Sequence, residues 1–137
     1  MEKAWLQKHL EIAITEYETV WMVEDKRLTK NGLNRYFAEG IGLPPETEPG
    51  HYDSILKPFA AEKGISIPEY EKLYYSRLIE NETLDAYFVH DRSVRESGHD
   101  TSYRLEGICA SLNTVELNAM LYKYETDFSY FIATYFD

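Results

Sequence analysis

The spacing of apolar residues predicts a chain built from helices. Near the N-terminus, apolar side chains recur every three or four residues, as on one face of a long amphipathic helix. This face carries Leu6, Leu10, Ala13, Tyr17, Val20 and Trp21. The same spacing predicts a last helix whose apolar face carries Leu117, Leu121, Tyr124, Phe128 and Phe131. No stretch has a convincing strand pattern, so we predict an all-α chain of about four to six helices.

The first and last helices are separated by a long loop and by shorter helices. Residues 23–50 lack periodicity and are rich in glycine and proline, so we expect an extended, ordered loop. A loop of this length is uncommon in a compact domain and is often functional. A second helix is expected to start near His51 and to cover residues 53–63, where Pro58 should kink or interrupt it and Gly64 should cap its C-terminus.

Capping signals place further helices. Ser66 and Glu69 form a capping box for a third helix that continues through Leu78. A short fourth helix is expected over residues 84–90, followed by a charged stretch. A second capping box, Asn113 with Glu116, is expected to start the last helix.

Composition and charge narrow the class of protein. The 137 residues are 44% hydrophobic and 28% charged, as in one soluble globular domain or part of one. A net charge of -10 without a basic cluster argues against nucleic-acid binding. Cys109 is the single cysteine, which favours a reducing compartment, and we expect it to be a small buried residue. The N-terminus is too charged for a signal peptide and no apolar run could span a membrane, so we predict a cytoplasmic protein.

The charged stretch VHDRSVRESGHDTSYRLEG, residues 89–107, holds the strongest candidate chemistry. Gly98 permits a tight turn or a close approach of a ligand. Arg95 offers five fixed donors that suit vicinal hydroxyl groups or carboxylates. Asp100 follows the turn, where a carboxyl group can point into a pocket and donate a proton. The alternative is a surface helix end, with Arg95 in a local ion pair and Asp100 as a cap, and spacing alone favours that alternative.

Four long segments resemble the fungal neutral trehalases of glycoside hydrolase family 37. They are AITEYETVWM, NGLNRYFAEGIGLPPETE, FVHDRSVRESGHDTSYRLEG and SLNTVELNAMLYKYETD, which together cover much of the chain. The resemblance implies an (α/α)6 barrel of the six-hairpin glycosidase type. It also implies hydrolysis of the α,α-1,1 bond of trehalose to two glucose molecules with inversion. Inversion needs a carboxylic acid and a carboxylate base, roughly 6.5–9.5 Å apart.

The resemblance also assigns roles to individual residues. Asp100 ends the segment that matches the family motif E-S-G-(H/W)-D, which implies that it is the general acid. Arg95 and Gly98 match positions of that motif that imply substrate contacts. Glu46, within LPPETE, matches a glutamate that lines the glucose subsite. His99 stands where other members carry Trp, which favours a packing or pocket-wall role over a catalytic one.

The resemblance is to part of the family's catalytic domain. The family's Gly-Gly-Arg and Gln-Trp-Asp signatures do not occur in this sequence, and neither does a counterpart of the glutamate that acts as base. The calcium-binding and phosphorylated regulatory region of the family is also absent from this chain. We therefore expect residues 1–137 to be a fragment that carries the acid and lacks the base, inactive in isolation. The alternative is a truncated, noncatalytic helical remnant or an interaction module.

Several consequences follow for ligands and partners. Trehalose and the missing parts of the barrel are the expected partners, with no nucleic acid, membrane, metal or organic cofactor. No histidine has the spacing of a metal ligand. Asn118 is a candidate for orienting the acid. An incomplete barrel should leave Leu117, Leu121 and Phe128 uncovered, which would promote association.

Overall fold

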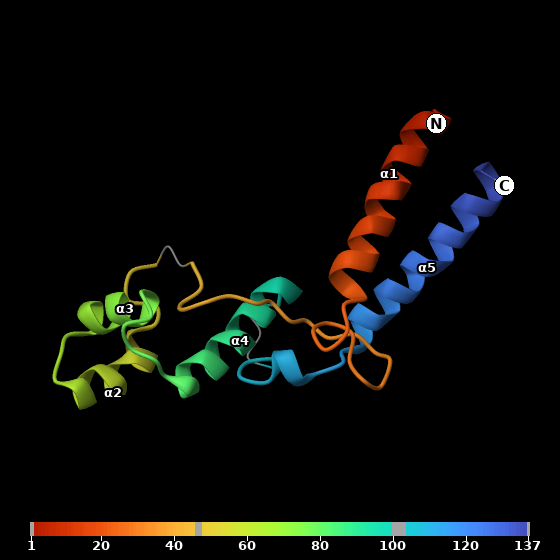
Figure 1. Cartoon of the computed structure of the whole chain (residues 1–137). Coiled ribbons are helices and arrows are strands. Elements are labelled where there is room, and N and C mark those ends of the chain that lie inside the picture. Colours follow the sequence, from red (N-terminus) through yellow and green to blue (C-terminus); the bar gives the residue numbers. More distant parts are fainter. Residues whose placement is uncertain (1, 46–47, 100–103, 137) are drawn as a thin grey trace. The chain divides into compact units, whose positions relative to one another are not determined.

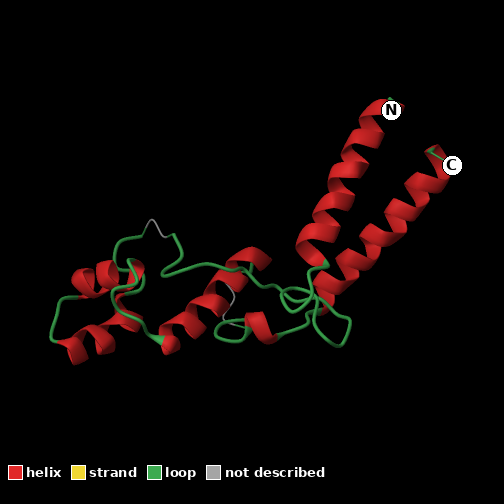
Figure 2. Ribbon diagram, viewed as in Figure 1, coloured by secondary structure: helices red, strands yellow, loops and turns green. Residues whose placement is uncertain are grey.

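Every regular element in the described part of the chain is helical. The computed structural model describes residues 2–45, 48–99 and 104–136. Within these ranges the ribbon shows helices and loops, and the only extended pairing is two isolated β-bridges in residues 24–34 (Figure 2). The all-α prediction is confirmed. The elements are α1 (Lys3–Glu16), η1 (Tyr17–Trp21), α2 (Asp53–Lys63), α3 (Ile67–Tyr75), α4 (Glu82–Ser97), η2 (Cys109–Ser111) and α5 (Val115–Tyr135).

The chain divides into two compact units. Unit 1 combines Met1–Phe37 with Cys109–Asp137, and unit 2 is the continuous segment Ala38–Ile108. Unit 1 therefore holds α1, η1, η2 and α5, whereas unit 2 holds α2, α3 and α4 (Figure 1).

In unit 1, α1 and η1 form one continuous helical segment that contacts α5 (Figure 1). The Tyr17 hydroxyl group donates a hydrogen bond to the Glu125 carboxylate on α5. Burial and this hydrogen bond raise the pKa of Tyr17 to about 12. The Tyr17 ring also meets Phe128 edge to face, with ring centroids 5.9 Å apart.

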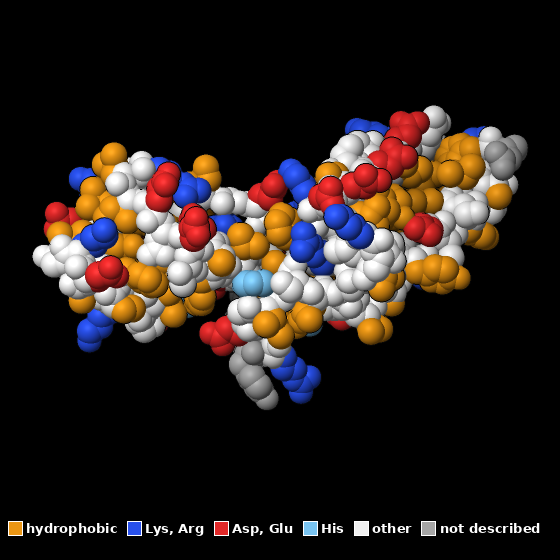
Figure 3. Space-filling view, turned by 60° about the horizontal axis from the view of Figure 1, so that its bottom comes forward, with side chains coloured by type: hydrophobic (Ala, Val, Ile, Leu, Met, Phe, Trp, Pro, Cys, Tyr) orange, Lys and Arg blue, Asp and Glu red, His pale blue; other side chains and the backbone are white. Residues whose placement is uncertain are grey.

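The apolar face of α5 is partly covered, in contrast to the prediction. Leu117 and Leu121 are only 2% and 5% exposed, so the expectation that they lie uncovered is wrong. Phe128 is half-buried. Apolar side chains are nevertheless visible on the surface of unit 1 (Figure 3). The large exposed ones on α5 are Val115, Met120, Tyr122, Tyr124, Tyr130, Ile132 and Tyr135.

The predicted capping box at the start of α5 is wrong. The N-cap residue is Thr114, whose side chain makes no capping bond. The Asn113 amide instead donates to Thr29 Oγ1 at 3.1 Å and to the Asn34 carbonyl at 3.1 Å. Asn113 therefore holds the loop before residue 37, because partners distant in the sequence compete for its side chain.

Unit 2 has an aromatic core with satisfied hydroxyl groups. The Tyr74 hydroxyl donates to Asp85 Oδ1 at 2.6 Å, and the Tyr70 hydroxyl accepts from Asn81 Nδ2 at 3.0 Å. Burial is the largest cause that raises the pKa of Tyr74. These tyrosines bury a ring while the polar tip finds a partner, as expected for buried tyrosine. The core consists of Leu43, Tyr52, Leu56, Ala60, Tyr70, Tyr74, Leu84 and Phe88.

The helices α2 and α3 follow their sequence signals closely. Helix α2 begins at Asp53, two residues after the predicted start near His51, and continues through Pro58, so the proline does not interrupt it. Gly64 caps it in the left-handed conformation, with φ of 67°. Ser66 Oγ accepts a hydrogen bond from the Glu69 N–H at 3.3 Å, which confirms the capping box. Helix α3 ends at Tyr75, three residues before the predicted end.

Helix α4 is longer than predicted. It spans Glu82–Ser97 rather than residues 84–90, so the first part of the charged stretch is helical. Asn81 caps its N-terminus by accepting a hydrogen bond from the Leu84 N–H at 3.1 Å. Leu84 and Phe88 bury one face in the core. Asp91, Arg92, Arg95 and Glu96 of that stretch lie on this helix, where side chains four residues apart can pair.

Candidate active site

The structure describes two of the four predicted site residues. Glu46 and Asp100 lie outside the described residues. Arg95 lies in the last turn of α4, and Gly98 is the C-cap of that helix, with φ of 73°. A side chain added at Gly98 would meet nothing within 4 Å, so its left-handed backbone, rather than crowding, is what favours glycine.

Arg95 is held by two side chains from different elements. Its Nε atom donates to Asp91 Oδ2 at 3.0 Å, one helical turn earlier on α4. Its Nη2 atom donates to the Tyr52 hydroxyl oxygen at 2.9 Å. The same hydroxyl group donates to Asp91 Oδ2 at 2.9 Å, which closes a triangle of hydrogen bonds. The local ion pair expected from the sequence is therefore present, within a larger network.

Tyr52 anchors this triangle in the core of unit 2. Tyr52 is 6% exposed. It is the residue directly before the first residue of α2. The ring meets Phe88 edge to face at a centroid distance of 5.1 Å. It meets His51 in the same way at 4.7 Å. The hydroxyl group is therefore placed by a well-packed ring.

The sequence reasoning missed both partners of Arg95. Asp91 had a signal, because a carboxylate four residues before an arginine pairs with it if the segment is helical. The predicted helix stops at residue 90, one residue before Asp91, so the sequence analysis did not pair Asp91 with Arg95. Tyr52 had none, because it is separated from Arg95 by 43 positions.

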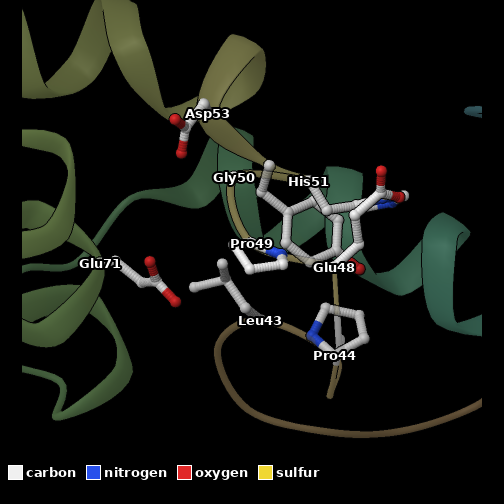
Figure 4. Close-up of a pocket in the computed structure, with 9 residues that line it drawn as sticks. Leu43, Pro44, Glu48, Pro49, Gly50, His51, Asp53 and Glu71 are labelled. Carbon is white, nitrogen blue, oxygen red and sulfur yellow. The ribbon is translucent and has the colours of Figure 1, made fainter.

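A pocket lies on the loop that follows Leu43. Its volume is about 360 Å³, and it opens between this loop, the start of α2 and Glu71 of α3 (Figure 4). Proline rings and the carboxylates of Glu48, Asp53 and Glu71 line it. Carboxylates accept hydrogen bonds, so such a wall suits a ligand with hydroxyl groups better than an anion.

Helix α4 also fixes residues 38–42, which lead into this loop. Arg92 Nη1 donates to the Gly42 carbonyl at 2.8 Å, and its Nε donates to the Ala38 carbonyl at 3.4 Å. The Ala38 N–H donates to Ser93 Oγ at 3.3 Å. Burial lowers the pKa of Arg92. One turn of α4 thus holds residues 38–42, and the next turn presents Arg95.

The remaining predicted residues play other parts. His99 is exposed, so it is not packed in the core of unit 2, and its role in a pocket wall stays a prediction. Cys109 is fully buried, as predicted. Asn118 makes its hydrogen bonds with the Asn34 backbone and the Thr114 carbonyl, at 2.8–2.9 Å. It holds a loop of unit 1, and this contact gives no support to a role in orienting an acid.

Among residues 2–45, 48–99 and 104–136, no group of three His, Cys, Asp or Glu side chains could hold a metal ion. No described helix is long and apolar enough to cross a membrane.

Comparisons with known proteins identify close relatives. Cytosolic neutral trehalase of Kluyveromyces lactis is 52% identical over 131 residues, which is 96% of this chain and 17% of that protein. Cytosolic neutral trehalase of Saccharomyces cerevisiae is 46% identical over 132 residues, 96% of this chain and 18% of that protein. The chain thus spans less than a fifth of the length of these curated relatives.

The structure also superposes on that of a solved relative. Neutral trehalase from Saccharomyces cerevisiae superposes with a TM-score of 0.89 and 47% identity, over 95% of this chain and 24% of that one. That protein is an (α/α)6 barrel, so the helices described above are part of that fold. Residues 1–137 match the family described as Trehalase. The chain therefore belongs to the trehalase family.

Proposed function

We propose that this chain forms part of the catalytic domain of an α,α-trehalase, which hydrolyses trehalose to two glucose molecules. The observation that carries the proposal is the 52% identity to a neutral trehalase over 96% of this chain. The relatives are named cytosolic neutral trehalases, and a cytosolic location is part of the same proposal.

In this proposal the chain supplies the acid side of an inverting reaction. Asp100 protonates the glycosidic oxygen as the bond to the leaving glucose breaks. Arg95, Gly98 and Glu46 contact the hydroxyl groups of one glucose unit. A carboxylate base outside residues 1–137 activates the attacking water from the opposite face. No metal ion or organic cofactor takes part.

The hydrogen bonds around α4 support this assignment of roles. Arg92 holds residues 38–42, which lead into the segment with Glu46, and Arg95 follows on the next turn. Arg95 in turn precedes Gly98, which caps α4 with a left-handed backbone two positions before Asp100 in the sequence. One helix therefore connects both segments that the proposal assigns to a glucose subsite.

The test places this chain in a complete enzyme. Residues 1–137 would replace the matching segment of the Kluyveromyces lactis protein, and glucose release from trehalose would be measured. We expect activity in this chimera and a loss of at least about 10²-fold with Asp100→Asn, which removes the acid but keeps the shape. Glu116→Gln is the matched control, because that carboxylate is exposed on α5. Full activity with Asp100→Asn would show that another group is the acid.

The isolated chain gives a second test of the same proposal. Without the base and the rest of the barrel, substrate cannot be oriented, and orientation can be worth about 7–11 kcal/mol of the barrier. We expect no glucose release from trehalose above a buffer control. Robust turnover by residues 1–137 alone would contradict the idea that the base lies elsewhere. An inactive chimera would favour the noncatalytic alternative.

A further inference from the structure

The Tyr52 hydroxyl group joins the two segments that carry the proposed site. Tyr52 follows the loop that contains Glu46, and Arg95 precedes Gly98 at the end of α4. The hydroxyl group donates to Asp91 Oδ2 at 2.9 Å and accepts from Arg95 Nη2 at 2.9 Å. The loop and the helix end are thereby linked through a single buried oxygen atom.

The triangle fixes the plane of the Arg95 guanidinium group. A guanidinium carries five N–H donors in one rigid plane. Its Nε and Nη2 atoms are both held, by Asp91 and Tyr52 respectively. Rotation of the plane would break both bonds, so these two residues restrain the direction of the guanidinium N–H groups.

Tyr52 is suited to this task because it cannot easily move. Its ring is packed against Phe88 and is only 6% exposed. Asp91 is on the same helix as Arg95, one turn earlier, so it moves with that residue. The position of Arg95 relative to the preceding loop therefore depends on Tyr52, whereas Asp91 orients both groups.

We infer that Tyr52 and Asp91 are positioning residues that aim Arg95 at the substrate. The inference rests on the proposed role of Arg95 as a substrate contact. Neither residue is expected to touch trehalose, and both act through the guanidinium group. Their loss should weaken substrate binding while the fold of unit 2 remains, because Tyr52→Phe keeps the packed ring and Asp91→Asn keeps the shape of the side chain.

The first experiment measures the Arg95 Nε–H group by NMR in the full 137-residue chain. Tyr52→Phe and Asp91→Asn should each shift its resonance and speed its exchange with water several-fold. Tyr70→Phe is the matched control, since its hydroxyl group lies in the same core but bonds Asn81. If Tyr52→Phe changes the Arg95 signal no more than Tyr70→Phe does, the inference is overturned, whatever the activity.

The second experiment is a double-mutant cycle in the chimeric enzyme described above. Tyr52→Phe should raise KM for trehalose about tenfold, the loss expected for one hydrogen bond to a charged group, with a smaller change in kcat. In an Arg95→Ala background the same substitution should have no further effect, because the residue it acts through is gone. A merely structural role would give the same effect in both backgrounds.

The pattern of results separates the two ideas. If Arg95→Ala has the same KM for trehalose as the unsubstituted chimera, the proposed role of Arg95 itself is overturned, and with it this inference. A raised KM in Arg95→Ala with no effect of Tyr52→Phe overturns only the positioning role. An effect of Tyr52→Phe that persists in the Arg95→Ala background also overturns it, because Tyr52 would then act by another route.

Discussion

His90 gives unit 2 a predictable response to acid. It lies on α4, where burial lowers its pKa from the ordinary value of 6.5. Above that pH the ring is neutral in the folded and unfolded chain. Below it the unfolded chain takes up the proton first, so the free energy of unfolding falls as the pH falls until the folded form is also protonated.

A substitution isolates this contribution. The free energy of unfolding is measured with urea at pH 7 and at pH 5. We expect it to fall less between these pH values in His90→Asn than in the unmodified chain. His99→Asn serves as the control, because that side chain is exposed in the same unit. Equal losses for His90→Asn and the unmodified chain would show that burial of His90 does not penalise its charged form.

Residue identities could be predicted where the signal is local. The burial of Cys109 followed from its residue type, and a local ion pair of Arg95 was one of two interpretations, although its partner Asp91 was not identified. Tyr52 could not be predicted as a partner of Arg95, because nothing in the sequence indicates which of twelve tyrosines meets it. That contact depends on how α2 and α4 pack around a shared core.

At the scale of elements, asparagines tie the long loop to α5. Asn34 is buried, and its backbone N–H and carbonyl both bond the side chain of Asn118. Its own side chain donates to the Trp21 carbonyl, at the end of η1. The segment around Asn34 is therefore ordered by hydrogen bonds to two helical elements, although it has almost no regular structure of its own.

Removing one of these asparagines should destabilise unit 1. Asn118→Ala leaves the backbone N–H of buried Asn34 without its partner and removes one of the two side-chain donors to its carbonyl, so we expect a loss of about 1–3 kcal/mol in chemical unfolding. The neighbouring change Thr114→Val is the control. Among the described residues, the Thr114 hydroxyl oxygen is buried without a hydrogen-bond partner, so its loss should be neutral or stabilising. Equal losses for both variants would contradict this account.

Element bounds were predictable where capping residues had no competitor. Ser66 is used as the sequence suggests, because the groups nearest to it are those of its own helix. Asn113 is not, because loop groups about 80 positions earlier take its side chain. The length of α4 was missed because Asp91 and Arg95 are neighbours only when the segment between them is helical.

At the scale of the whole molecule, helical periodicity was sufficient to predict the fold class. The long motifs were sufficient to identify the family. The acid and the glutamate of the proposed subsite, Asp100 and Glu46, fall outside the described residues, so their roles stay predictions. The division into two units had no signal in the sequence. It arises because segments at opposite ends of the chain pack together, and no local pattern encodes such a pairing.

This order of segments has a consequence for the growing chain on the ribosome. Residues emerge from the N-terminus at about 5–20 per second, and a unit can fold once all its parts are outside. Unit 2 is complete when Ile108 has emerged, whereas α1 must wait for α5 to be translated. We expect protease to cleave α1 but spare residues 53–97 in nascent chains whose exposed part ends at residue 108. Protection of α1 at that length would contradict this order; otherwise α1 meets its partner α5 only after all of unit 2 has been made.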